Sequence, residues 1–413
     1  MDAEIKAWSM QVTQKPTVFI AGATSIFGLD RMKAEFEAAG FDTAFVDAPF
    51  MRPFASADET ENIAFSASIK CPGNSFIIPL SEYWISYCIE NNNARISRRA
   101  LLASRSKEFL YNVLASKNID VPKAYSTKEE ALEALKNGRK IIVKPKGLHS
   151  GYGVEIVEEA DPALLDKHFL CAGSISNKAM RIMNIENEGA MLSEFIEGTE
   201  FSADCFCFNG KKSLVRLCKK NIVSIKGKPC TAACQIIEPS PEIVSALQSW
   251  LDALFDDSDI SFAQFDFIIE ESGRIIPIDF AARVGGGMLE LLKELPFNVY
   301  AASVKEAAAS SRKKLETSAY SKIFSDSTFV SAPLTQLNYL STKSGYIVDD
   351  NFPLYAGKQI INKHKGDYAI SNPSSVQSRL AVVVAHLPDT EVPQELLDSL
   401  LLAEPYIGGK DKA

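Results

Sequence analysis

Two aspartates inside apolar, strand-like runs constrain this chain more than any other feature of its sequence. Asp266 and Asp279 each interrupt such a run, and the Glu-Ser-Gly turn between the runs predicts a hairpin that sets the carboxylates side by side. Buried carboxylates cost free energy unless they are paired or bind a metal. Their hard oxygens suit Mg²⁺ (or Mn²⁺), with phosphate oxygens completing the shell. The alternative is an ordinary hairpin with one buried ion pair between Asp279 and Arg283.

A lysine followed by a glycine-rich loop is the second informative feature. Lys144 ends an apolar strand-like run and supplies a compact positive charge for phosphates. The glycines after it allow backbone N–H groups to approach phosphate oxygens, and the loop can close over them. The loop residues expected at the phosphates are Lys146, Gly147, Ser150, Gly151 and Gly153. The pattern is not a Walker P-loop, because no Gly-Lys-Ser/Thr opens a helix. The alternative is a hairpin whose tip happens to hold three glycines.

An acidic turn between two strand-like runs is the third feature. The run 190–195 ends in this turn, and the next run begins with Glu200. Adenine needs one hydrogen-bond acceptor and one donor, which extended backbone offers, and a carboxylate can accept from ribose hydroxyls. The segment is therefore compatible with a nucleoside site, and equally with an acidic surface hairpin.

Composition excludes several classes of protein. The 413 residues carry a net charge of −8, which argues against nucleic acid or an anionic membrane as the main partner. Eight cysteines without a CxxC pair, together with four histidines, make a zinc site or a disulfide framework improbable. Cys205 and Cys207 alternate along one run, so we expect buried thiols on a shared face. No run is long enough for a membrane helix, and a cytoplasmic location is the default expectation.

The order of the expected elements indicates several packed units. In the first hundred residues strands alternate with helices, which predicts a small parallel sheet. Strand-like runs dominate from 190 to 280, with a helix near 239–255, and further helices are expected at 288–313 and 393–402. We place domain boundaries to give units at 1–104, 105–195, 196–300 and 301–413.

Taken in order, these pieces resemble the ATP-grasp superfamily, with motif-level similarity over roughly residues 100–290. The resemblance implies an α/β (α+β) fold with a small parallel-sheet N-terminal domain, a glycine-loop lid subdomain and a large antiparallel-sheet domain. The run that opens with Ser106-Lys107 matches the segment carrying the first ATP-binding lysine. Lys144 matches the second lysine, and the loop 147–153 matches the mobile lid.

The same resemblance assigns the remaining site residues. It places adenine at a hinge formed by Glu194, Phe195 and Ile196, and the ribose hydroxyls at Glu200. Asp266 and Asp279 match the two metal-binding acids. Arg283 and the glycines after it resemble the closing Arg-x-Gly-Gly, which implies that Arg283 stabilises an acylphosphate or an oxyanion. Lys219 or Lys220 is a weaker candidate on a nearby strand, where a solvated surface lysine is an equal alternative.

The resemblance implies a ligase that transfers phosphate from ATP to a small carboxylate, expected to be that of an amino acid, and joins the acylphosphate to an amine. The expected partners are therefore small molecules, and the family is often dimeric. The usual final motif is Glu-x-Asn, whereas this chain has Asp279-Phe280-Ala281. Because alanine cannot bind metal, a nucleotide-binding module with degenerate activity stays open. ATP-dependent carboxylation and purine-type ligation are two further reactions compatible with the resemblance.

Overall fold

The computed structural model describes residues 15–55, 60–148, 151, 153–174, 189–371, 378–388 and 391–409. Its first unit is a parallel sheet with the strand order β3-β2-β1-β4. The strands are β1 (Thr17–Ala21), β2 (Asp42–Asp47), β3 (Ile63–Phe65) and β4 (Phe76–Pro79). Helices α1 (Leu29–Ala38) and α3 (Glu82–Asn91) follow β1 and β4. All four residues of β4 are buried, as in a sheet covered on both faces. The expected small parallel sheet is confirmed, and β3 adds a strand that was not predicted.

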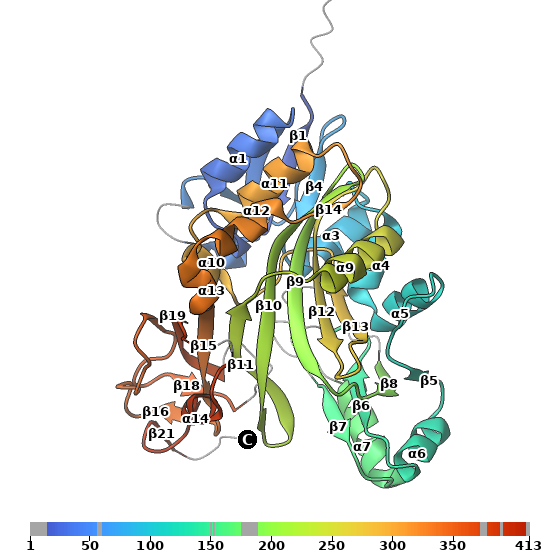
Figure 1. Cartoon of the computed structure of the whole chain (residues 1–413), viewed down its shortest axis with the longest axis vertical. Coiled ribbons are helices and arrows are strands. Elements are labelled where there is room, and N and C mark those ends of the chain that lie inside the picture. The colour runs from blue at the N-terminus through green and yellow to red at the C-terminus, as the bar shows by residue number, and fades with distance from the viewer. Residues whose placement is uncertain are drawn as a thin grey trace, which may run out of the picture.

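A second, four-stranded sheet carries the glycine-rich loop (Figure 1). Its antiparallel order is β5-β8-β6-β7. The strands are β5 (Ala124–Tyr125), β6 (Ile141–Pro145), β7 (Glu155–Val157) and β8 (Ala190–Glu194), and the helices are α6 (Lys128–Lys136) and α7 (Pro162–Ser174). Ile141, Val143, Leu165 and Leu192 belong to a hydrophobic cluster of this unit, separate from the main core. A subdomain with its own core can move as one body.

The largest sheet has ten strands among the described residues. Its main path runs β13-β12-β9-β10-β11-β15-β19-β17, and all pairs on this path are antiparallel. The strands are β9 (Thr199–Phe208), β10 (Lys211–Ile225), β11 (Lys228–Ile236), β12 (Ile260–Ile269), β13 (Ile275–Ala281), β15 (Leu334–Ser341), β17 (Lys358–Ile361) and β19 (Arg379–His386), with β14 (Leu315–Glu316) and β20 (Leu401–Leu402) at its sides. This confirms the expected large antiparallel sheet.

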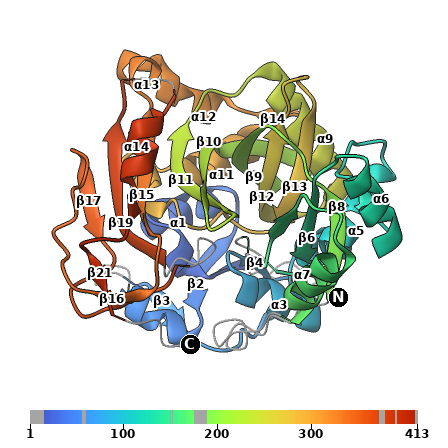
Figure 2. The ribbon, with the colours of Figure 1, turned by 90° about the horizontal axis from the view of Figure 1, so that it is seen from below.

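The sheet continues beyond residue 300, because β15 pairs with β11 and carries β19 and β17 with it. Figure 2 shows these strands on the opposite side of the molecule from β6 and β8 of the four-stranded sheet. A further small sheet contains β16 (Gly345–Ile347), β18 (Tyr368–Ala369) and β21 (Ile407–Gly408). The four proposed domain boundaries stay predictions.

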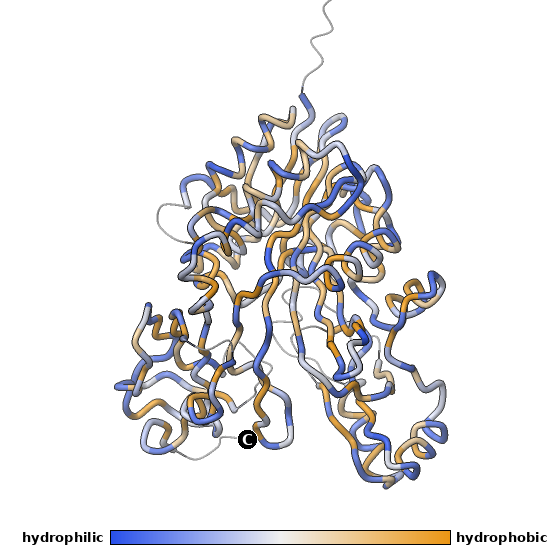
Figure 3. Tube along the Cα trace, in the orientation of Figure 1, coloured by the Kyte–Doolittle hydropathy of each residue, from blue (hydrophilic) through white to orange (hydrophobic). Residues whose placement is uncertain are grey.

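Residue alternation gives β12 an apolar face and, at Gln264 and Asp266, a polar one. Phe265 and Phe267 on β12 contact Trp250 of helix α9 (Pro241–Leu254). Gln264 and Asp266 alternate with them, and successive side chains in a strand point to opposite faces. Cys205 and Cys207 are buried on β9, as expected. Figure 3 shows hydrophobic segments along the interior strands and hydrophilic segments at many outer turns. The sheet therefore presents its polar face for a site.

The remaining helices refine the expected boundaries. They are α4 (Arg98–Arg105), α5 (Lys107–Ala115), α10 (Leu289–Lys293), α11 (Val299–Ala309), α12 (Ser318–Ser321), α13 (Ser327–Ser331) and α14 (Gln394–Ser399). The helical stretch expected at 288–313 is thus two helices, and the last helix ends before β20, which pairs with β15. Ser106 separates α4 from α5, and its hydroxyl caps α5 by accepting from the N–H of Phe109. None of the described helices has the length and apolar character needed to cross a membrane.

Candidate nucleotide and metal site

The two aspartates lie where the predicted hairpin places them. Asp266 on β12 and Asp279 on β13 are direct partners in the antiparallel register, so both side chains leave the same face of the sheet. Both are partly exposed, at 23% for Asp266 and 28% for Asp279, so a ligand can reach them. The alternative ion pair between Asp279 and Arg283 is contradicted, because Arg283 pairs with a carboxylate of the N-terminal unit instead.

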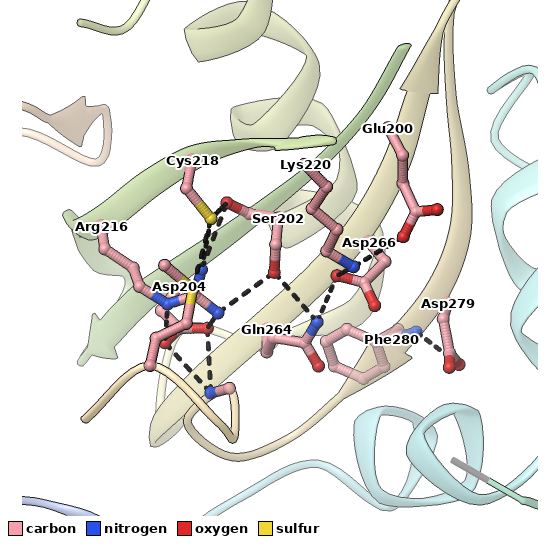
Figure 4. A network of polar contacts seen from close by, with 12 residues as sticks. Glu200, Ser202, Asp204, Arg216, Cys218, Lys220, Gln264, Asp266, Asp279 and Phe280 are labelled. Carbon is pink, nitrogen blue, oxygen red and sulfur yellow. Dashed lines mark hydrogen bonds and ion pairs between the residues drawn. The ribbon is translucent and has the colours of Figure 1, made fainter. Parts of the chain in front are cut away.

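Two lysines neutralise this acidic pair (Figure 4 shows Lys220). Lys107 Nζ, at the start of α5, lies 3.1 Å from an Asp279 oxygen. Lys220 Nζ, on β10, lies 2.9 Å from an Asp266 oxygen and 2.6 Å from a Glu200 oxygen. Lys219, its neighbour on the same strand, pairs with Glu391 instead. Of the two candidate lysines on this strand, Lys220 is therefore the one that joins the site.

The ionisation of this cluster follows from burial and pairing. Burial alone would lower the pKa of Lys220, but Asp266 and Glu200 together raise it above the usual lysine value. Burial would raise the pKa of Asp266, but Lys220 lowers it below the usual value. The pKa of Glu200 is raised by burial, which Lys220 only partly offsets. At neutral pH, Lys220 is thus an ammonium ion beside the Asp266 carboxylate, and no proton is available from Asp266.

Lys144 has a different environment from the other lysines. Its side chain is buried, and Nζ donates a hydrogen bond of 2.6 Å to the Tyr111 hydroxyl, which in turn donates to the carbonyl of Ile278. Burial and, after it, the nearby positive charge of Lys107 lower the pKa of Lys144 to about 7, while Asp279 opposes the shift. No described carboxylate pairs with Lys144, so an anion bound beside it would favour its charged form.

The start of the glycine-rich loop is tied to helix α5. The backbone N–H of Lys107 donates to the carbonyl of Lys146, and Lys146 Nζ lies 2.6 Å from a Glu108 oxygen. Gly147 follows and is buried, whereas Gly151 and Gly153 have φ of 68° and 69°. Ser150 lies outside the described residues. The loop thus begins beside Lys107 and Lys144, and its contacts with phosphate stay a prediction.

The predicted adenine hinge lies at the end of β8, the second strand of the four-stranded sheet. The N–H of Glu194 donates to the carbonyl of Lys123, and the N–H of Phe195 donates to that of Lys140. A Glu194 carboxylate oxygen also accepts from the N–H of Lys123. No described residue accepts from the N–H of Ile196, which is therefore the available backbone donor for an adenine ring nitrogen. The roles of Glu194, Phe195, Ile196 and Glu200 stay predictions.

Arg283 connects the site to the N-terminal unit. Its Nε donates to Glu82 at 2.8 Å, and the other oxygen of Glu82 lies 3.0 Å from Arg105. Glu82 opens α3, directly after the carboxyl end of β4, where open α/β sheets bind ligands. The Arg283 guanidinium thus faces the junction of the two units, and its catalytic role stays a prediction.

A buried ion pair holds the segment that follows Arg283. Arg216 on β10 forms two hydrogen bonds, of 2.7 and 3.1 Å, with Asp204 on β9, and both side chains are fully buried. Asp204 also accepts from the N–H of Gly285 at 3.0 Å. A Cβ atom at residue 285 would lie 2.0 Å from the Arg216 guanidinium, so only glycine allows this approach. The pair therefore fixes the path of the chain beside the site.

Replacing Asp204 by asparagine should destabilise the protein strongly, because it leaves Arg216 buried without a countercharge. We expect the free energy of unfolding in urea to fall by about 3–5 kcal/mol. The matched control is Asp256→Asn, which breaks the exposed pair with Arg99 and should cost no more than about 1 kcal/mol. Equal losses in the two variants would contradict the structural role of the buried pair.

The residues present fit one divalent cation. Asp266 and Asp279 supply carboxylate oxygens from facing, partly exposed positions, and Mg²⁺ commonly uses one or two carboxylates with phosphates and water. Among the described residues, no three His, Cys, Asp or Glu side chains are arranged to hold a metal. Ala281 is buried and offers no ligand. The site therefore suits a cation that arrives with a triphosphate.

Several residues of the site carry no sequence signal. Tyr111 lies in the apolar pattern of α5, and Glu82 opens an unremarkable helix. Asp204 and Arg216 each alternate with apolar residues along their strands. This pattern would have indicated a buried ion pair only if the two strands had been known to be neighbours.

Comparison with known proteins bears on the fold. No protein-family model and no curated protein matches the sequence. Among solved structures, an L-amino acid ligase from Bacillus licheniformis has a TM-score of 0.58 at 14% identity, covering 94% of this chain and 97% of that one. The N5-carboxyaminoimidazole synthetase of Staphylococcus aureus, complexed with ADP, has a TM-score of 0.55 at 12% identity, covering 93% and 95%.

A third structure is the biotin carboxylase domain of the Hydrogenobacter thermophilus 2-oxoglutarate carboxylase, in complex with MgADP, ADP and bicarbonate. Its TM-score is 0.54 at 14% identity, covering 91% of this chain and 87% of that one. Similarity at such low identity concerns the path of the chain rather than the reaction. The chain therefore shares the fold of those enzymes along nearly its whole length, and the expected mixed α/β architecture with a small parallel sheet and antiparallel sheets is confirmed.

Proposed function

We propose that this protein is an ATP-dependent ligase that phosphorylates a small carboxylate and joins it to an amine. The observation that carries the proposal is the polar cluster at the β12–β13 hairpin. There, Asp266 and Asp279 face each other on one strand pair, and Lys107 and Lys220 neutralise them. Lys144 lies nearby, and its buried amine has no carboxylate partner among the described residues. Phosphoryl transfer from a metal-bound nucleotide needs carboxylates that hold the metal ion. It also needs positively charged side chains beside them that bind the phosphates.

In this proposal each residue would have a separate role, which its position in the site determines. Lys107 and Lys144 would bind the phosphates, and Asp266 with Asp279 would hold Mg²⁺, which when bound neutralises charge on the phosphate oxygens. The N–H of Ile196 would orient adenine. Tyr111 would hold the Lys144 amine in place by its hydrogen bond. The lid, with its own core, would exclude water that otherwise hydrolyses the intermediate.

The proposed reaction has two steps. A carboxylate oxygen of the acid attacks the γ-phosphorus of ATP, and the bond to ADP breaks, which gives an acylphosphate. The amine nitrogen then attacks the acyl carbon, the bond to the phosphate oxygen breaks, and phosphate and a proton leave. Arg283 would stabilise the negative charge on the acyl oxygen during this second step.

A trapping experiment tests the proposal. The protein is incubated with Mg-ATP, hydroxylamine and pooled amino acids, and hydroxamate, ADP and phosphate are measured. We expect ADP and hydroxamate in equal amounts with at least one acid. Binding of ATP without turnover on any acid would favour the alternative of a nucleotide-binding module. Ala281, which removes a ligand position from the motif, is the observation that favours that alternative. ATP-dependent carboxylation is tested in parallel with bicarbonate as the acid.

A further inference from the structure

Gln264 is a polar residue beside the acidic pair that the proposed reaction does not use. It lies two positions before Asp266 on β12, so both side chains leave the same face of the sheet. Its direct partner on β13 is Ala281, in the same way that Asp279 is the partner of Asp266. Direct partners also share a face. The polar face of the hairpin thus carries two carboxylates side by side and, next to them, an amide opposite a methyl group.

The amide of Gln264 is held in one orientation. Its nitrogen, Nε2, donates a hydrogen bond of 2.8 Å to Asp266 Oδ1 and a longer one, of 3.4 Å, to the Ser202 hydroxyl. The Asp266 carboxylate pairs with the Lys220 ammonium and can only accept, so the amide must turn its N–H groups toward it. Figure 4 shows the nitrogen directed at these two partners and the oxygen turned away from them. The neighbouring acid therefore sets the position of the amide oxygen.

The amide oxygen of Gln264 is available to a ligand. No described residue donates a hydrogen bond to Oε1, and this oxygen is not one of the fully buried polar atoms without a partner in the described part of the chain. It can therefore be reached from outside the sheet. An N–H group that donates to a carboxylate polarises its amide and increases the negative charge on the oxygen. The bond to Asp266 thus makes Oε1 a better donor of electrons to a cation.

The acidic pair alone supplies few oxygens for an octahedral cation. Each aspartate uses Oδ1 for its ion pair with a lysine, which keeps only Oδ2 out of that contact. Glu200 is held by the Lys220 ammonium, which also contacts Asp266, and no third acid among the described residues completes a metal site. Ala281 offers no oxygen. The Gln264 amide is therefore the neutral, hard oxygen on this face that a cation such as Mg²⁺ can use.

We propose that the Gln264 amide oxygen is a protein ligand of the divalent cation, in place of a ligand that position 281 lacks. The inference rests on the proposed function, which assigns the cation to Asp266 and Asp279. Because Ala281 carries only a methyl group, it leaves room on the shared face for the longer side chain opposite it. The ligand thus comes from β12 instead of β13, and alanine at position 281 is compatible with a complete cation site.

Binding of Mn²⁺ in the presence of ADP, measured by electron paramagnetic resonance, tests this assignment. Gln264→Ala should bind Mn²⁺ at least about tenfold more weakly, since loss of a residue that only supports a metal ligand already has an effect of this size. Gln359→Ala, which removes an exposed glutamine on β17, is the matched control and should stay within about twofold of the unmodified protein. Equal affinities in Gln264→Ala and the unmodified protein would overturn the proposal.

A labelling experiment separates direct ligation from support of Asp266, because Gln264 also donates to that acid. The unmodified protein is made with glutamine carrying ¹³C at the side-chain carbonyl, and its complex with Mn²⁺ and ADP is studied by electron–nuclear double resonance. We expect a ¹³C hyperfine coupling typical of a carbonyl bound to the metal, and its loss in Gln264→Ala. Absence of the coupling would show that Gln264 only positions Asp266. A coupling that persists in Gln264→Ala would assign the ligand to another glutamine.

Moving the amide to the facing strand tests the exchange between the two positions. In the double variant Gln264→Ala with Ala281→Asn, an amide oxygen returns to the same face from β13. Affinity for Mn²⁺ should recover most of what Gln264→Ala loses. If the added asparagine restores nothing, the two positions do not substitute for one another, and that part of the proposal fails.

The labelled complex also keeps the inference distinct from the proposed function. If the ¹³C coupling appears but no acid is ever phosphorylated, the proposed function fails and Gln264 stands as a metal ligand. If acids are phosphorylated and the coupling is absent, the proposed function stands and the inference fails. If Mn²⁺ does not bind with ADP, the inference fails whatever the protein catalyses.

Discussion

Replacing Asp266 and Asp279 together by asparagine is expected to reduce ATP-dependent turnover by at least about 10³-fold, because each change removes preorganised charge at the transferring phosphate. The side chains keep their size, and their partners Lys107 and Lys220 stay in place, so the fold should persist. Turnover is measured as ADP release at saturating Mg-ATP. Binding of Mn²⁺ in the presence of ADP, followed by electron paramagnetic resonance, should weaken in parallel.

Asp257→Asn serves as the control for this double variant. Asp257 is 73% exposed, pairs with Lys313 and lies outside the site, so turnover should stay within about twofold of the original. If the double variant kept most of its turnover, the acidic pair would have no role in phosphoryl transfer, and the proposed function would lose its main support.

Lys144 should make nucleotide binding depend on pH in a defined direction. Its pKa of about 7 in the free protein means that the amine is largely neutral at pH 8. Bound nucleotide phosphates favour the ammonium form, so binding at pH 8 should take up close to one proton. Affinity for Mg-ADP should therefore fall by up to about tenfold per pH unit above pH 7. Calorimetry in buffers of different ionisation enthalpy measures the proton uptake directly.

The lowered pKa of Lys144 also makes the stability of the folded protein depend on pH. An unfolded lysine titrates near pH 10.4, whereas Lys144 in the folded chain titrates near 7, so between these values the unfolded state binds more protons. The contribution of Lys144 to stability without nucleotide should thus rise with pH across this window, by at most about 1.4 kcal/mol per unit.

Lys144→Met should abolish both pH dependences and lower turnover by about 10²–10³-fold, since a buried phosphate ligand is lost. Lys128→Met, which affects a lysine on α6 that pairs with Asp166, should change neither. Proton uptake that persists in Lys144→Met would show that another group titrates.

The acidic hairpin was predictable because its pairing is local. The tight turn makes the strands of Asp266 and Asp279 neighbours, although the two residues become direct partners only because a β-bulge between Asp266 and Phe267 shifts the register. The parallel sheet of the first hundred residues was predictable for a similar reason, since its strands and helices alternate in consecutive segments of the chain. In both cases the chain had to close only short loops.

The partners of these residues were not predictable. Lys220 and Lys219 look alike in the sequence, and only the register of β10 against β9 decides which of them reaches Glu200 and Asp266. Glu82 meets Arg283 across two separate units, and Arg379 reaches Gly287 from a strand added late to the sheet. Such contacts join positions far apart in the chain, and no local pattern encodes which strands become neighbours.

The sequence by itself therefore determined the types of chemical group available, the hairpin and the single strands, since backbone propensity and side-chain alternation act over a few residues. The tertiary structure decided which cations are neutralised, which are left for a ligand, and how burial moves the pKa of Lys144. Those properties depend on long-range packing, because desolvation and countercharges come from whichever distant segments the fold brings together.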